Sequence, residues 1–110
     1  MQEYVSEQQR LNREVLAVIN QLPILSVKAA ETERDYRKAL SIKTLTLKKA
    51  GYPVTIMNEL TRGDDKVADL RFKRDVAREN LKIAYEKIYF YKWQVRILTE
   101  NTKIDMAVRD

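Results

Sequence analysis

Apolar and small residues recur along the first half of the chain in alternating steps of four and three positions. This spacing predicts one long helix from about Gln2 to Ala50, with a heptad seam of the kind that packs against another helix. Ser6 and Gln9 fit a capping box, which offers an alternative start for this helix. The predicted seam consists of Leu11, Val15, Val18, Leu22, Leu25, Ala29, Thr32, Tyr36 and Ala39.

Pro23 lies in the middle of this predicted helix, where it removes one backbone hydrogen bond. The heptad phase continues past Pro23 without a slip, which favours a kink in one helix over two separate helices. In the alternative arrangement, the segment before Pro23 folds back as a third helix. The end of the helix is well marked, because Gly51 suits the left-handed cap and Pro53 prevents continuation.

A second long helix is predicted after a connection over residues 51–63, which holds a single helical turn at Ile56–Leu60. Asp64 fits the N-cap, and we expect this helix to span residues 64–101 and to leave 102–110 as a frayed tail. Only an arginine interrupts its seam, which consists of Val67, Leu70, Arg74, Ala77, Leu81, Ala84, Ile88, Tyr91, Val95 and Leu98.

Two long helices with a short connection predict an all-α fold, a single domain over residues 1–110 built as an antiparallel helical hairpin. The 110 residues include only 2 Gly and 2 Pro, which argues against turn-rich β folds. The second helix also has an apolar stripe beside its seam, and one partner helix cannot cover both. We therefore expect the hairpin to form a homodimer, as in a four-helix bundle. The stripe recurs every seven residues at Val76, Ile83, Phe90, Ile97 and Ile104.

The chain contains neither Cys nor His, which excludes disulfides, thiolate or imidazole metal sites and the catalytic groups that need these side chains. Its two glycines are too far apart for a phosphate-binding loop. Clustered carboxylates can hold Mg²⁺, but helix capping and ion pairing explain them better here. We therefore expect no enzyme activity, cofactor, metal or small-molecule substrate. The absence of a signal or membrane-spanning segment predicts a cytoplasmic protein that avoids membranes.

Positive charge is concentrated in two stretches, although the net charge of the chain is only +5. Residues 37–49 hold five bases and no acid, and residues 66–96 hold nine bases and four acids. An antiparallel hairpin brings both stretches together at its loop end, where they attract phosphates or acidic protein surfaces. A solvated face with scattered ion pairs is the alternative interpretation. The predicted loop-end basic patch consists of Lys43, Lys48, Lys49, Arg71, Lys73 and Arg74.

Three aromatic residues follow one another at helical spacing on the second helix, with bases on either side. Such a face suits the centre of a protein interface, or stacks on unpaired nucleic-acid bases while the cations hold phosphates. Burial against another helix of the same assembly is the structural alternative. We name this candidate site the aromatic–basic face, and it consists of Lys82, Tyr85, Tyr89, Lys92, Trp93 and Arg96.

About half of the chain, from Glu31 to Glu86, resembles small helical accessory proteins of bacteriophages and prophages of Gram-positive bacteria. The resemblance lies in ETERDYRKAL (31–40), LKKAGYPVT (47–55), LTRGDDKVADL (60–70) and RFKRDVAREN (71–80). It implies a bacterial cytoplasmic setting without enzyme activity, and it transfers no functional residue to this chain.

Three functions follow as expectations from these features. The first is a dimeric binding protein that docks on a host bacterial protein of nucleic-acid metabolism or defence, as an inhibitor would. The second is direct, sequence-independent nucleic-acid binding, with an affinity that falls steeply with salt. The third is a structural assembly adaptor of a phage particle.

Overall fold

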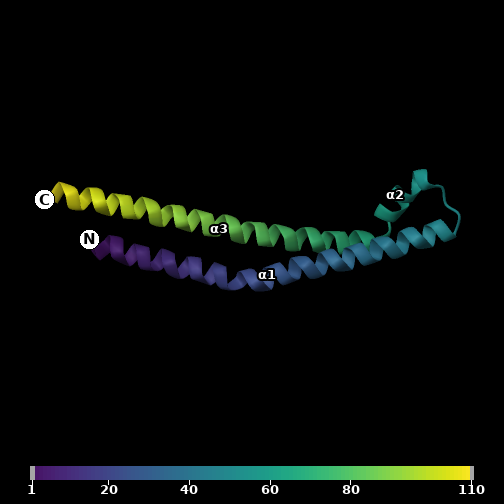
Figure 1. Cartoon of the computed structure of the whole chain (residues 1–110), viewed down its shortest axis with the longest axis horizontal. Coiled ribbons are helices and arrows are strands. Elements are labelled where there is room, and N and C mark those ends of the chain that lie inside the picture. The colour runs from purple at the N-terminus through teal and green to yellow at the C-terminus, as the bar shows by residue number, and fades with distance from the viewer. Residues whose placement is uncertain (1, 110) are drawn as a thin grey trace. The chain divides into compact units, whose positions relative to one another are not determined.

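The computed structural model describes residues 2–109, and helices account for all of them apart from two short connections. Three helices follow one another, α1 (Gln2–Lys49), α2 (Val54–Arg62) and α3 (Asp65–Arg109), as Figure 1 shows. No strand occurs among residues 2–109, so the predicted all-α fold class is confirmed. The predicted turn at Ile56–Leu60 is the centre of a longer helix, α2, which starts directly after the extended Pro53.

α1 continues through Pro23 as a single helix. The alternative in which the segment before Pro23 folds back as a third helix is therefore wrong. The heptad phase explains this outcome, because the seam residues on either side of the proline, Leu22 and Leu25, both remain partly buried. Packing of the seam outweighs the loss of one backbone hydrogen bond at the proline nitrogen.

Contacts divide the chain into two compact units, Met1–Pro23 with Lys82–Asp110, and Ile24–Leu81. The second unit contains α2 and the adjoining parts of α1 and α3. Glu33 of α1 pairs with Arg78 of α3, and Lys43 of α1 pairs with Asp64 at the start of α3. Later positions on α1 thus meet earlier positions on α3, which makes the two helices antiparallel within this unit.

The buried residues of the Ile24–Leu81 unit are mostly small, and they include seam positions of both long helices. Small side chains at a helix contact allow the two backbones to lie close together. Two residues of α2, Met57 and Thr61, are buried, and so is Val67 near the start of α3. The buried positions are Thr32, Ala39, Leu47, Met57, Thr61, Val67 and Ala77.

The other unit packs the first part of α1 against the last part of α3, with Leu11, Ala84 and Ile88 buried. The amide of Gln8 donates a hydrogen bond of 2.8 Å to the Thr99 hydroxyl across this contact. Each predicted seam position of both helices is either buried or partly buried within its own unit. The heptad pattern therefore predicted the packed face of each helix correctly.

α1 ends as the sequence predicts, with Gly51 in the left-handed conformation at φ +86°. The Tyr52 N–H donates to the Leu47 carbonyl and the Gly51 N–H donates to the Lys48 carbonyl. This pair of bonds is the Schellman motif, which satisfies two carbonyls at the end of a helix. The polypeptide is thereby turned out of α1 within two residues.

α3 begins at the predicted N-cap, because the Asp64 carboxylate accepts a 3.1 Å hydrogen bond from the Val67 N–H. This backbone hydrogen bond, supported by the nearby Lys43 ammonium, lowers the pKa of Asp64. The far end differs from the prediction, since α3 continues past Asn101 to Arg109 instead of leaving a tail at 102–110. No Gly or Pro follows Gly63, and the next seam positions, Thr102 and Asp105, are partly buried.

No stretch within these helices, over the residues that the structure describes, is both long and apolar enough to span a membrane.

The two glycines allow a direct test of the α1 end. We expect Gly51→Ala to lower the free energy of unfolding by about 1 kcal/mol, because alanine resists positive φ. The added methyl group meets no atom within 4 Å, so the effect isolates backbone strain. Gly63→Ala is the control, since Gly63 already has φ −82°. Urea unfolding followed by circular dichroism compares the variants, and equal effects would contradict the assigned role of Gly51.

Candidate binding surfaces

The aromatic–basic face lies on α3 in the Met1–Pro23/Lys82–Asp110 unit, and its three rings are all exposed. The exposed fractions are 44% for Tyr85, 68% for Tyr89 and 58% for Trp93. Neighbouring residues Ala84 and Ile88 are buried against α1, so the helix itself turns the aromatic rings outward. Three rings spaced by four positions form a row along one side of the helix.

The three cations of this face, Lys82, Lys92 and Arg96, are also exposed. None of them forms an ion pair with any residue that the structure describes. Their charge is therefore available to an external anion or carboxylate. Exposed Tyr and Trp beside an unpaired Arg is the combination that contributes most binding energy at protein interfaces.

The loop-end basic patch lies in the Ile24–Leu81 unit, and four of its six side chains form an ion pair or a hydrogen bond within the chain. Lys43 pairs with Asp64 at 3.3 Å and Lys73 pairs with Asp69 at 3.3 Å. Arg71 donates a 3.3 Å hydrogen bond to the backbone carbonyl of Arg62, at the end of α2. These three cations of the patch therefore have partners within the chain.

Lys48 and Lys49, the other two lysines of the patch, form no ion pair with residues that the structure describes. They occupy the last turn of α1, where the helix dipole favours positive charge.

Arg74 interrupts the apolar seam of α3, and an aromatic ring and two carboxylates surround its guanidinium. Its guanidinium lies over the Tyr36 ring at 4.3 Å and pairs with Asp75 at 2.9 Å. It also lies 3.7 Å from the Glu33 carboxylate. A cation stacked on an aromatic ring and neutralised by two acids tolerates partial burial at a helix contact.

Glu33 is the centre of this charge cluster. Its carboxylate pairs with Arg37 on the same helix at 2.6 Å and with Arg78 on α3 at 2.8 Å. The hydrogen bond from Arg37, followed by the charges of Arg78, Arg37 and Arg74, lowers the pKa of Glu33. We call Glu33 with these three arginines the Glu33 cluster, which links α1 to α3 within the Ile24–Leu81 unit.

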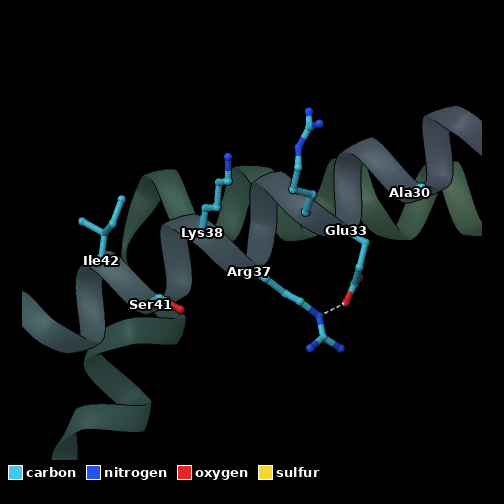
Figure 2. Close-up of a pocket in the computed structure, with 7 residues that line it drawn as sticks. Ala30, Glu33, Arg37, Lys38, Ser41 and Ile42 are labelled. Atoms are coloured by element: carbon cyan, nitrogen blue, oxygen red, sulfur yellow. Dashed lines mark hydrogen bonds and ion pairs between the residues drawn. The ribbon is translucent and has the colours of Figure 1, made fainter.

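An open hollow of about 710 Å³ lies beside this cluster on α1. Figure 2 shows Glu33 and Arg37 directed toward each other, while the Lys38 side chain points to the other side of the helix. All the residues that line the hollow belong to α1. Small-molecule sites are usually concave and surround most of their ligand, whereas one helix contacts a ligand from one side only.

The clustered carboxylates, candidate Mg²⁺ ligands by residue type, have other roles in the structure. Asp64 caps α3, Asp69 pairs with Lys73, and Asp35 pairs with Arg34. No group of three or more Asp or Glu side chains suited to a metal ion occurs in the part of the chain that the structure describes.

The apolar stripe of α3 is exposed throughout, from Val76 to Ile104. The positions three residues after its first four members hold Glu79, Glu86, Trp93 and Glu100, of which only Trp93 is apolar. Counting steps of three and four from Ile83 reveals a second seam-like face that includes Trp93. Trp93 therefore belongs both to the aromatic–basic face and to this second seam.

Comparison of the chain with protein-family models, with curated proteins and with solved structures gives no match. The resemblance to phage accessory proteins remains a prediction. The surfaces described above are therefore the basis for any proposal about function.

The lowered pKa of Glu33 makes the stability of the chain depend on pH. Because the folded chain holds this carboxyl ionised below its ordinary pKa, the contribution is present near neutral pH and is lost as pH falls through that lowered value. We expect Glu33→Gln to destabilise the chain more at about pH 6 than at about pH 3. Asp35→Asn, on the same helix, is the control, and urea midpoints measure both. A Glu33→Gln penalty that does not change with pH would contradict this role.

Proposed function

We propose that the chain is a non-enzymatic, self-associating binding protein that docks on an acidic protein surface through its aromatic–basic face. In this proposal α1 and α3 form one antiparallel helical hairpin along their whole lengths. The single observation that supports it best is the row of exposed rings beside three cations without intramolecular partners.

A protein partner is favoured over nucleic acid by the acids next to the face. Glu86 and Glu100 lie on the same helix, one turn from Lys82 and Arg96, and both are exposed. A row of phosphates along the face would lie close to these carboxylates, and the like charges would repel each other. A protein surface with acids opposite the bases and polar groups opposite the acids avoids this repulsion.

The contrast between the two candidate surfaces supports the same choice. Three of the six cations of the loop-end basic patch, Lys43, Lys73 and Arg74, pair with carboxylates. The aromatic–basic face keeps its charge and adds apolar area. Apolar area with unpaired cations allows both desolvation of the rings and charge pairing with a partner.

The resemblance to phage accessory proteins suggests the class of partner. It favours a bacterial protein of nucleic-acid metabolism or defence, which the chain would inhibit by occupying its surface. Direct, sequence-independent nucleic-acid binding is the second candidate, and the net charge of +5 favours it.

A pair of matched double variants tests which surface docks. We expect Tyr85→Ala with Lys92→Ala to abolish capture of one dominant protein from nuclease-treated bacterial lysate, identified by mass spectrometry. Lys49→Ala with Tyr52→Ala is the control, because it also removes one exposed tyrosine and one unpaired lysine, but from the loop end. We expect this control to retain the captured protein.

Three results would contradict the proposal. Loss of capture only in the control would move the docking surface to the loop end. Equal capture by both variants would exclude both surfaces as the docking site. Retention of oligonucleotides with an affinity that falls steeply with salt, without a captured protein, would favour direct nucleic-acid binding.

A further inference from the structure

The last part of α3 has a second seam on its exposed side. Within the Met1–Pro23/Lys82–Asp110 unit its apolar members are exposed by 39% at Ile83, 56% at Phe90, 58% at Trp93 and 37% at Ile97. Successive members are three or four positions apart, the spacing that a partner helix requires. We name this face the outward seam, and it consists of Ile83, Glu86, Phe90, Trp93, Ile97 and Glu100.

Charges along the outward seam follow a regular order. A base directly precedes two of its isoleucines, since Lys82 precedes Ile83 and Arg96 precedes Ile97. Neither base has an ion-pair partner among the described residues, and the same holds for Glu86. Glu100 has only an exposed contact of 3.8 Å with Lys103. The seam therefore offers an equal number of acids and bases to whatever covers it.

We propose that the outward seam of a second copy covers this one, with the two α3 helices antiparallel about a twofold axis between Tyr91 and Lys92. In antiparallel pairs each seam residue faces the alternate seam position of the other helix. The central layers then place Phe90 against Trp93 of the second copy. This inference rests on the self-association in the proposed function, but not on its docking surface.

Charge complementarity selects this arrangement. In the next layers Ile83 faces Glu100 of the second copy, which puts that carboxylate beside Lys82. Ile97 likewise faces Glu86 of the second copy, which puts that carboxylate beside Arg96. The twofold axis repeats both pairs, so four acid–base contacts flank two aromatic layers.

Other arrangements of the same two seams bring less favourable groups together. A parallel pair in register places Glu86 against Glu86 and Glu100 against Glu100, which is repulsive. An antiparallel pair shifted by one heptad places Phe90 against either Glu86 or Glu100, depending on the direction of the shift. Both shifts bury an acid against the ring that the proposed register pairs with Trp93.

The proposed pair is compatible with docking through Tyr85 and Lys92 of the aromatic–basic face. Trp93 is covered at the centre of the pair, Lys82 and Arg96 are paired with the second copy, and Tyr89 lies at the edge. Tyr85 and Lys92 project from α3 nearer the main seam and stay exposed, so both copies present them on the same side of the pair. Two neighbouring docking surfaces then act together on one partner.

A charge exchange tests the register. Glu86→Arg alone and Arg96→Glu alone each place like charges together across the dimer contact. We expect each to raise the dimer dissociation constant at least tenfold, roughly the effect of several lost charge pairs. Analytical ultracentrifugation measures this constant. We expect the double variant to regain the wild-type dissociation constant within about threefold. The two positions are ten residues apart on one helix, about 15 Å, so rescue reports a contact between copies.

Cysteine pairing gives an independent test, because the chain has no cysteine of its own. Ile83→Cys and Glu100→Cys are each oxidised alone and as an equal mixture. We expect a disulfide-linked dimer only in the mixture, since each position lies about 25 Å from its own copy in the antiparallel register. Circular dichroism verifies that all variants keep their helix content.

Each alternative outcome has a definite meaning. Disulfide dimers of each variant alone would indicate a parallel pair and overturn the proposal, as would a dimer that the charge exchange leaves unrescued. A monomer at every concentration, with Trp93 fully open to acrylamide quenching, would overturn self-association as well. Docking through Tyr85 and Lys92 would then be judged by the capture experiment alone.

Discussion

The packing of α1 against α3 along one stripe of each helix is the constraint on which the other features of this protein depend. Within each unit two long helices cover only the sides that face each other, so most of their surface stays in water. Even the seam positions are often only partly buried, and the buried ones are mostly small. Such narrow contacts bury little apolar area, which limits the hydrophobic contribution to stability.

Polar interactions consequently have an unusual share in defining the fold. The Asp64 cap and its Lys43 neighbour fix the start of α3, while Gly51 ends α1 within two residues. The Glu33 cluster connects the two long helices across the seam and provides a place for Arg74, which a purely apolar contact would exclude. The same interactions pair Lys43 and Arg74 of the loop-end basic patch with carboxylates inside the chain, which weakens the case for that surface as a binding site.

The aromatic–basic face and the outward seam both follow from the uncovered side of α3. A helix that packs on one stripe exposes its opposite side, and here that side holds large apolar residues in a regular spacing. Exposed patches of this kind on soluble proteins usually mark interaction surfaces. Because Trp93 belongs to both surfaces, the proposed self-association and the proposed docking use one region of α3 and divide its residues between them.

The sequence by itself determined the helices, the caps at Gly51 and Asp64 and the seam, because these depend on backbone bonds within one turn and on a heptad repeat. Prediction failed where no local signal exists. Asn101 resembles a helix end, yet α3 continues past it, because partial burial of Thr102 and Asp105 extends the seam. The sequence predicted which cations could bind a partner, but only the tertiary structure decided which of them pair with acids inside the chain. Glu33 meets Arg74 and Arg78 across more than forty positions of chain, and a contact over such a distance depends on how the helices pack.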